Sequence, residues 1–240
     1  MPLIERDTAD SAVTSSTSRL WAGALLFAVF FCLTAAIVLY GQTESIERRG
    51  LEVLRNTRNP ARIIGPKPVG EWMMETTTLG GYTVLTMLFV FLWIFLRLRK
   101  DASRYFLLLS MTGGYGVHVL LKYVFARPRP DVVPHLVDAG MASFPSGHAF
   151  MSTVTYYALA VIFSRWTDDR RIHFLFFAAA TLLMLLVGVS RVFVGVHYPT
   201  DVVAGWTSGG AWLALTMIVA RRNGWLRTVG PAQAAGTSKN

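Results

Sequence analysis

Six apolar stretches constrain the fold of this chain more than any other feature of its sequence. They cover residues 20–40, 79–96, 105–121, 149–164, 174–189 and 202–220. A helix needs roughly 17–25 mostly apolar residues to cross a hydrocarbon core of about 30 Å. The first and last stretches reach this length by themselves. The fourth and fifth reach it only if residues 144–148 and 190–193 are helical as well.

Backbone groups cannot stay unpaired in lipid, so all six stretches are predicted to be helices rather than strands. The expected fold class is therefore all-α, a polytopic membrane protein with six transmembrane helices. Composition agrees, because 53% of the residues are hydrophobic and only 15% are charged, whereas soluble domains carry about 25% charged residues. No polar linker divides the chain, which predicts a single domain.

The net charge of +9 allows nucleic acid or an anionic membrane surface as a partner. The basic residues lie in short clusters between the apolar stretches, which favours the lipid bilayer and argues against nucleic acid. The single cysteine, Cys32, excludes an intrachain disulfide. By the positive-inside rule both termini are predicted to be cytoplasmic, because the short connections on that side carry Arg97, Arg99, Lys100, Arg104, Arg165, Arg170 and Arg171.

The segments outside the six stretches have patterns of their own. Residues 1–19 are polar and form a predicted cytoplasmic segment ahead of a membrane domain over residues 20–227. Within that domain, residues 42–75 predict an amphipathic helix on the outer face, broken by Pro60, Pro66 and Pro68. Residues 228–240 are small and polar, and a disordered tail is expected there.

Polar residues gather at the ends of four predicted helices, all on the outer face. Ionisable residues at such positions are costly unless they are paired or used, which indicates a functional site. Arginine forks match phosphate oxygens, lysine adds a point charge, and a helix start offers free N–H groups to an anion. A phosphate-binding set is therefore predicted from Lys122, Arg129, Ser146, Gly147 and Arg191.

Two histidines and one carboxylate in the same region predict chemistry as well as binding. Asp201 follows His197 by four residues and can accept the proton of one ring nitrogen, which leaves the other nitrogen as a nucleophile. His148 can protonate the leaving alkoxide and later take a proton from water. Carboxylates are too few for a two-metal site of the usual kind, so neither a metal nor another cofactor is expected.

Three ordered motifs carry a resemblance to a known family. Residues 122–130 read K-x6-R-P, residues 145–148 read P-S-G-H, and residues 190–201 read S-R-x5-H-x3-D. Together they resemble the signature of the type 2 phosphatidic acid phosphatase superfamily, with no departure at any signature position. The stretch from Lys122 to Asp201 covers about a third of the chain.

This resemblance implies a metal-independent lipid phosphatase that works through a phosphohistidine. His197 would be the nucleophile, Asp201 its orienting partner and His148 the general acid, with the phosphate held by Lys122, Arg129, Ser146, Gly147 and Arg191. The family shares a helical core with acid phosphatases and vanadate-dependent haloperoxidases. Six spans with an outward site resemble the bacterial membrane branch, which includes phosphatidylglycerophosphate and undecaprenyl pyrophosphate phosphatases, and imply an inner-membrane protein with a periplasmic site.

Several alternatives stay open at this point. A lipid phosphotransferase would use the same residues, and a non-catalytic lipid-binding or transport protein belongs to another class. The substrate lipid and the oligomeric state are not readable. Arg127 could face headgroups or a second phosphate. His118 is expected to be buried and hydrogen-bonded, with a place in the same pocket as the alternative, and His135 is a candidate for headgroup contact.

Overall fold

The structure, a computed structural model, describes residues 3–140 and 142–227, with side chains from residue 17 onward. Its elements are α1 Leu3–Leu39, α2 Glu44–Val53, α3 Lys67–Thr78, α4 Tyr82–Leu98, α5 Ser103–Leu108, the π-helical turn η1 Leu109–Gly113, α6 Gly114–Phe125, α7 Gly147–Ser164, α8 Arg170–Phe193 and α9 Pro199–Arg222. One isolated bridge, between Arg55 and Ile63, is the only β pairing in the described part of the chain. The predicted all-α class is confirmed.

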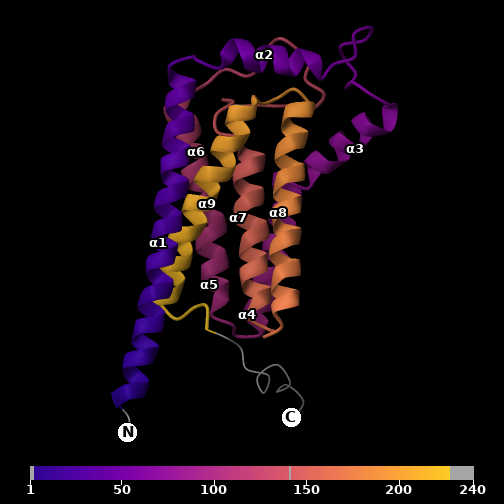
Figure 1. The fold of residues 1–240 in the computed structure, drawn as a ribbon. Helices are drawn as coiled ribbons and strands as arrows, with labels where there is room; N and C mark the ends of the chain where they lie inside the picture. Colours follow the sequence, from indigo (N-terminus) through magenta and orange to yellow (C-terminus); the bar gives the residue numbers. More distant parts are fainter. Residues whose placement is uncertain (1–2, 141, 228–240) are drawn as a thin grey trace.

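The bundle places α7 at its centre, and the flanking helices cover it (Figure 1). Most residues of α7 are buried, among them Phe150, Val154 and Ile162. Its neighbour α9 approaches closely because small residues face it. A Cβ at Gly205 would lie 2.6 Å from the carbonyl oxygen of Ser146, so only a glycine allows this separation of the two backbones. This close packing ties together the starts of two helices.

The predicted count of six spans is not confirmed by the described helices. Three described helices are long and apolar enough to cross a membrane by themselves, namely Thr17–Leu39 within α1, α8 and α9. The pair α3 and α4 passes the same test together, with a bend of 44°, which gives up to four candidate spans among the described residues.

Because α7 is enclosed by protein, it can carry hydroxyl side chains that a lipid-facing helix would avoid. The α5–η1–α6 path is divided by its π-helical turn.

The π-helical turn has an identifiable packing partner. The Ser110 carbonyl accepts a hydrogen bond from Trp212 Nε1 at 2.9 Å in addition to one from the backbone N–H of Gly114, and the Ser110 hydroxyl lies 3.0 Å from that of Thr216. Gly113 and Gly114 lie against the Trp212 ring, where a Cβ would meet ring atoms at 2.5 and 3.1 Å. Such insertions often occur near functional sites because they change the face that a helix presents.

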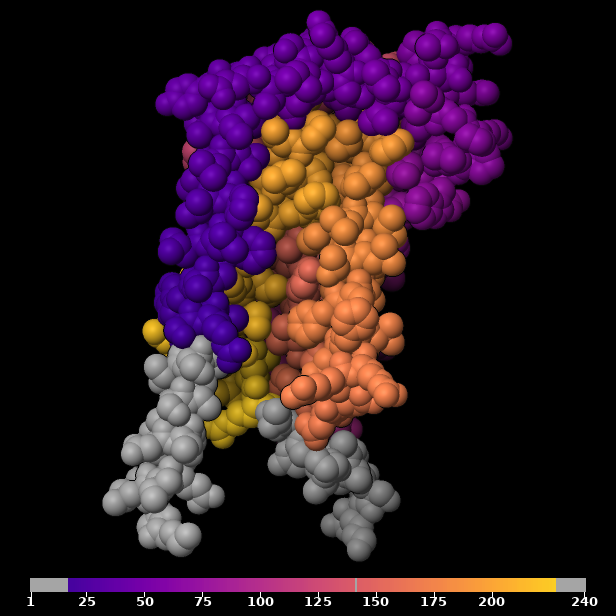
Figure 2. Space-filling model, viewed as in Figure 1, coloured from indigo at the N-terminus to yellow at the C-terminus, as the bar shows by residue number. Residues whose placement is uncertain are grey.

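Helix α2 lies across one end of the bundle, and the following loop continues over the same end (Figures 1 and 2). The segment coloured purple in Figure 2 covers the ends of helices coloured orange and yellow. Leu51 anchors α2 there by packing against Val133 and Tyr198. The start of α1 and the end of α9 lie at the opposite end of the bundle (Figure 1).

Local boundaries differ from the sequence predictions at three places. The fourth apolar stretch starts its helix at Gly147, so residues 144–146 are not helical, whereas residues 190–193 do extend α8 as expected. Pro66 and Pro68 begin α3 instead of breaking a helix, because a first-turn proline lacks only an N–H that would be unpaired anyway. Helix α1 crosses the expected boundary at residues 19 and 20 without interruption, and the predicted tail 228–240 lies outside the described residues.

Candidate functional site

A short turn joins α8 to α9 and carries His197. Gly195 has a φ of +81°, a left-handed conformation that glycine adopts without strain, and the turn packs so closely that a Cβ there would lie 2.2 Å from Arg55. Arg55 donates to the carbonyl oxygen of Phe193 at 2.5 Å, which secures the end of α8. The turn therefore holds His197 in a fixed position beside the first residues of α9.

His197 is 2% exposed and lies beside Asp201. Its Nδ1 is 3.3 Å from Asp201 Oδ2, and its Nε2 is 3.3 Å from a guanidinium nitrogen of Arg129. Burial lowers the pKa of His197 to about 3, the charges of Arg191 and Arg129 act in the same direction, and Asp201 opposes them. The imidazole is thus neutral at physiological pH, as a nitrogen nucleophile must be.

Asp201 is fully buried and accepts hydrogen bonds on both carboxylate oxygens. Oδ2 accepts from the Ser143 hydroxyl and from the backbone N–H of Tyr198 at 2.9 Å. Oδ1 accepts from Arg127 at 2.7 Å. With this many donors the carboxylate cannot rotate, so the side facing Nδ1 of His197 is fixed.

Arg127 connects the site to the interfacial helix α2. Its second guanidinium nitrogen lies 2.9 Å from Oε2 of Glu47, which is 5% exposed, and its guanidinium carbon lies 4.2 Å from the centre of the Tyr198 ring. Glu47 also accepts from the backbone N–H and the hydroxyl of Thr200, at 2.9 and 2.7 Å. The structure thus gives Arg127 a role that the sequence analysis did not consider, because its guanidinium pairs with two carboxylates.

The three predicted phosphate-binding cations come from three different segments of the chain. Lys122, on α6, donates to the carbonyl oxygen of Ala142. Arg129, in the α6–α7 loop, donates to the carbonyl oxygens of Val196 and Gly140, both at 2.7 Å. Arg191, on α8, donates to the Thr77 hydroxyl at 2.7 Å. Within the described part of the chain, neither Lys122 nor Arg191 forms an ion pair, so their charge is available to an anion.

The start of α7 adds hydrogen-bond donors to this cluster. The backbone N–H of Ser146 donates to the carbonyl oxygen of Asp201 at 2.9 Å, which ties the first turn of α7 to the first turn of α9. The Ser146 hydroxyl is buried and has no hydrogen-bond partner among the described residues. A buried polar atom without a partner calls for an explanation, and a bound anion at a helix start supplies one.

His148 lies in the first turn of α7, beside the bend between α3 and α4. Its ring centre is 6.1 Å from that of Tyr82, and the planes of the two rings make an angle of 64°. A Cβ on Gly80 would lie 3.2 Å from the His148 ring, so the bend packs directly on this imidazole. The hydrogen bond from Ser146 to Asp201 joins the first turn of α7, which carries His148, to the first turn of α9, which lies beside His197. Both histidines therefore lie at the same end of the bundle as the three cations.

Comparison with known proteins identifies the family. The PAP2 superfamily model matches residues 103–225, which is just over half of the chain and contains the whole cluster. The chain belongs to the PAP2 superfamily. Phosphatidylglycerophosphatase B of Bacillus subtilis is 30% identical over 186 residues, which cover 77% of this chain and 87% of that protein.

Two further similarities place the chain among membrane PAP2 proteins. The crystal structure of a transmembrane PAP2-type phosphatidylglycerolphosphate phosphatase from Bacillus subtilis superposes with a TM-score of 0.74 at 26% identity, covering 83% of this chain and 96% of that one. Lipid A 1-phosphatase of Rhizobium etli is 37% identical over 124 residues, or 47% of this chain. The match spans about half the length of that relative, 48%.

A groove extends from the site of this PAP2 chain along the bundle. It has a volume of 490 Å³ and lies between α4, the η1–α6 segment and α7. Tyr82 stands at its head, because the Tyr82 ring also contacts His148. The other lining residues are mostly apolar, namely Leu85, Thr86, Phe89, Met111, Thr112, Tyr115 and Met151.

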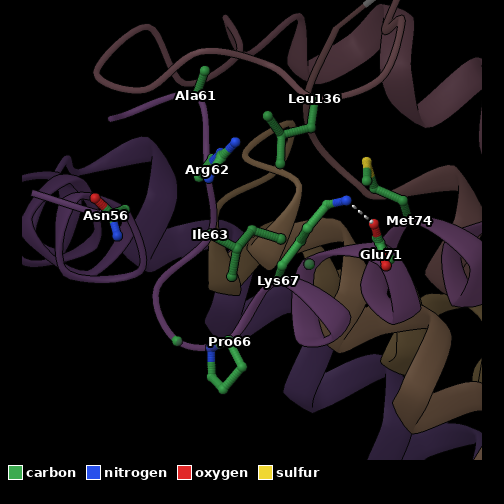
Figure 3. Close-up of a pocket in the computed structure, with 11 residues that line it drawn as sticks. Asn56, Ala61, Arg62, Ile63, Pro66, Lys67, Glu71, Met74 and Leu136 are labelled. Carbon is green, nitrogen blue, oxygen red and sulfur yellow. Dashed lines mark ion pairs between the residues drawn. The ribbon is translucent and has the colours of Figure 1, made fainter. Parts of the chain in front are cut away.

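A second cavity, of 270 Å³, lies away from the PAP2 cluster (Figure 3). It is enclosed by the connection from α2 to α3, the start of α3 and Leu136 of the outer loop. Its lysine, Lys67, is paired with Glu71 at 3.2 Å, the ion pair drawn in Figure 3. None of the predicted catalytic or phosphate-binding residues lines it, so the cluster around His197 is the better candidate for chemistry.

Several residues around the PAP2 cluster were not predicted from sequence. The contacts come from outside the three motifs, from residues that carry no local signal, namely Ser143, Glu47, Thr77 and Tyr82.

His118 is buried as expected, although no hydrogen bond joins it to another described residue. His135 lies 2.7 Å from the carbonyl oxygen of Pro130 within the outer loop. Among the described residues, no group of three or more His, Cys, Asp or Glu side chains could hold a metal ion.

Proposed function

We propose that this protein is a lipid phosphate phosphatase that hydrolyses a phosphomonoester or diphosphate headgroup through a phosphohistidine, without a metal ion. One observation carries the proposal. The neutral imidazole of His197 has Nδ1 beside Asp201 and Nε2 directed at Arg129. Lys122 and Arg191 have no carboxylate partner among the residues that the structure describes. An anion with a phosphorus atom would complete this arrangement, because its oxygens would neutralise the cations while the phosphorus faced Nε2.

In the first step, Nε2 of His197 attacks phosphorus and forms an N–P bond. The bond between phosphorus and the bridging oxygen breaks, and that oxygen takes a proton from His148 as the lipid alcohol or lipid phosphate leaves. Lys122, Arg129 and Arg191, with the free N–H groups of the first turn of α7, hold the charge on the other oxygens.

In the second step, water takes the place of the departed lipid. His148, now without its proton, accepts one from the water, and the oxygen of that water forms a bond to phosphorus while the N–P bond breaks. Inorganic phosphate is released and His197 returns to its neutral form. Asp201 keeps the proton on Nδ1 throughout, so that the same nitrogen serves as nucleophile and leaving group.

The lipid nature of the substrate is supported by the groove between α4, η1–α6 and α7. A mostly apolar groove that starts at Tyr82, beside His148, suits an acyl or prenyl chain attached to the leaving oxygen. The relatives are named for phosphatidylglycerophosphate and lipid A 1-phosphate. We infer an inner-membrane location with the site at the periplasmic face and cytoplasmic termini, supported by the positions of α2 and of the two ends of the bundle (Figure 1).

The proposal is tested by measuring phosphate release from the purified full-length protein in detergent micelles. The substrates are phosphatidic acid, phosphatidylglycerophosphate, undecaprenyl diphosphate and lipid A, with no added phosphoryl acceptor. We expect release from at least one of them, and we expect His197→Ala to abolish it while the variant still inserts. The matched control is His173→Ala, a histidine at the opposite end of the bundle, which should leave the rate within about twofold.

A trapping experiment tests the intermediate itself. Rapid quenching with a ³²P-labelled substrate should give an acid-labile, base-stable phosphoenzyme in the wild-type protein and none in His197→Ala. Turnover that persists in His197→Ala would refute the covalent mechanism. Label that is found on an added acceptor lipid, with none released as inorganic phosphate, would show a phosphotransferase instead.

A further inference from the structure

Two polar side chains outside the family motifs converge on Gly147. A Cβ built on Gly147 would lie 2.6 Å from the Tyr82 hydroxyl and 2.6 Å from Nε2 of His118. Tyr82 reaches this point from the start of α4, and His118 reaches it from α6, one turn before Lys122. Glycine at position 147 thus leaves room for two hydrogen-bonding groups directly beside the predicted phosphate-binding helix start.

Neither group has a hydrogen-bond partner among the residues that the structure describes. His118 is 1% exposed and its Nδ1 is buried without a partner, while its ring lies 5.8 Å from that of Phe150. No described residue exchanges a hydrogen bond with the Tyr82 hydroxyl. Tyr82 is 42% exposed and lines the groove, whereas His118 is buried. Buried polar groups are normally paired, so the unpaired imidazole of His118, with the Tyr82 hydroxyl beside it, points to a ligand that supplies a partner.

The position of this pair relative to the two histidines identifies the part of the ligand. Tyr82 packs on His148, the predicted general acid, and its ring lines the head of the groove. His197 instead contacts Asp201, Ser143 and Arg129. The pair therefore lies on the side of His148, where the bond between phosphorus and the leaving oxygen breaks.

We propose that the Tyr82 hydroxyl and Nε2 of His118 bind the leaving-group end of the substrate, at the junction between the phosphate site and the groove. This inference rests on the proposed function. Tyr82 donates a hydrogen bond to the bridging oxygen as the bond to phosphorus breaks, and His148 supplies the proton that this oxygen keeps. His118 binds the first polar atoms of the headgroup beyond that oxygen.

The test compares two substrates that differ in their leaving groups. The alcohol of a lipid phosphate is a poor leaving group and needs help at its oxygen, whereas the phenolate of p-nitrophenyl phosphate leaves without a proton. For Tyr82→Phe we expect kcat/KM to fall about tenfold with the best lipid of the panel above and less than about twofold with p-nitrophenyl phosphate. The matched control is Tyr123→Phe, an exposed tyrosine on α6, which should change neither value.

A second pair of variants tests His118. His118→Gln places an amide nitrogen near the position of Nε2 and should keep most of the activity on the lipid, whereas His118→Leu should lose about tenfold. Melting temperatures of all variants, measured by tryptophan fluorescence, report whether packing is intact. His118→Leu alters a buried site and could lower activity through packing alone. The activity kept by His118→Gln and the result for Tyr82→Phe therefore determine whether these side chains contact the leaving group.

The outcomes separate this inference from the proposed function. Suppose that the wild-type protein releases phosphate but Tyr82→Phe lowers kcat/KM equally for the two substrates, or for neither. The leaving-group contact is then refuted and the phosphatase proposal stands. The same holds if glutamine at position 118 behaves like leucine. If the wild-type protein releases no phosphate from the lipid panel or from p-nitrophenyl phosphate, the proposed function itself fails.

Discussion

Arg127 links Glu47 on the interfacial helix α2 to Asp201 on α9, with nitrogen–oxygen distances of 2.9 and 2.7 Å. The carboxylate beside Nδ1 of His197 is therefore connected to a helix that lies across the end of the bundle (Figure 1). Charged groups with this degree of burial are costly to separate, because each would remain in a poorly solvated environment. The connection explains why α2 is fixed in position, and it makes α2 part of the site.

Glu47→Gln should lower turnover even though Glu47 is not expected to touch substrate. The substitution removes the negative charge that pairs with one end of the Arg127 guanidinium, whose other end pairs with Asp201. Arg127, and with it the Asp201 carboxylate beside His197, would then be less constrained. We expect kcat to fall about tenfold, equivalent to about 1.4 kcal/mol, with KM changed less than twofold. The rate of phosphoenzyme formation in a single turnover measures this effect directly. Glu44→Gln, an exposed carboxylate on the same helix, is the control, and equal effects of the two variants would contradict the linkage.

Asp201→Asn should affect turnover far more than substrate binding. All the groups around this side chain are donors, so the new amide N–H₂ meets other donors and the proton on Nδ1 of His197 loses its acceptor. A drop in kcat of about 100-fold or more is expected, as for an orienting carboxylate in other nucleophile–histidine systems, with a smaller change in KM. Steady-state kinetics on the best lipid substrate provide the measurement. An unchanged turnover number would mean that Asp201 does not orient the nucleophile.

The stability of the protein should fall as pH decreases through the range where His197 would bind a proton if unfolded. Its pKa is lowered to about 3 in the folded protein and is about 6.5 when unfolded. The unfolded state therefore binds more protons between these values, so this contribution is complete above pH 6.5 and is lost progressively toward pH 3. Between pH 8 and pH 5 the loss amounts to about 2 kcal/mol, or about 4–8 °C in melting temperature.

Comparing the pH dependence of the melting temperature in the wild type and in a His197 variant separates the contribution of His197 from that of other titrating groups. Melting temperatures in detergent are measured at pH 8 and pH 5 for the wild-type protein and for His197→Gln. The variant should show a smaller drop, by the amount given above. A His197→Gln protein with the full wild-type drop would show that this imidazole does not resist protonation.

Gly205→Ala should destabilise the bundle without altering any charged group. Its Cβ would lie 2.6 Å from the Ser146 carbonyl oxygen and 2.8 Å from Ala149, so α7 and α9 would have to separate. Overpacking of this kind costs about 1–3 kcal/mol, or roughly 2–12 °C in melting temperature. The matched control is Gly116→Ala, because nothing lies within 4 Å of a Cβ there. Its helix should be unchanged or slightly more stable, and a Gly205→Ala protein as stable as this control would contradict the packing argument.

The residues of the candidate site could be proposed from the sequence because the family motifs are local, whereas the residues that contact them could not. Lys122, Arg129, Ser146, Arg191 and His197 carry charge or polarity at the ends of apolar stretches, where such groups are unexpected and therefore conspicuous. Their convergence follows once four helix ends are placed on one face. No signal of this kind marks a glutamate within an amphipathic segment or a tyrosine at the start of an apolar stretch.

Glu47 and Tyr82 show the two ways in which such residues are missed. Glu47 is one of several carboxylates in a charged segment, and only the tertiary position of α2 distinguishes it from Glu44. Tyr82 reads as an ordinary apolar-stretch residue until the bend after α3 brings its hydroxyl to Gly147. Both depend on contacts between residues far apart in the chain, which local patterns do not encode.

Helix boundaries were less predictable than helix existence for a related reason. Apolar content locates a helix, but its ends depend on which backbone groups find other partners. The backbone of Ser146 is extended, with ψ of 118°, and its N–H donates to the carbonyl oxygen of Asp201, so α7 begins at Gly147. The transmembrane count is similarly affected, since α7 is enclosed by neighbours and need not be as apolar as a helix in contact with lipid.

The groove headed by Tyr82 has a consequence for how the rate of this protein responds to its substrate. A lipid whose chain lies in that groove arrives by diffusion in two dimensions and is never dissolved in water. Saturation would then follow the mole fraction of that lipid among its neighbours, and adding inert detergent or phospholipid at a constant total amount of substrate would slow the reaction by dilution within the surface.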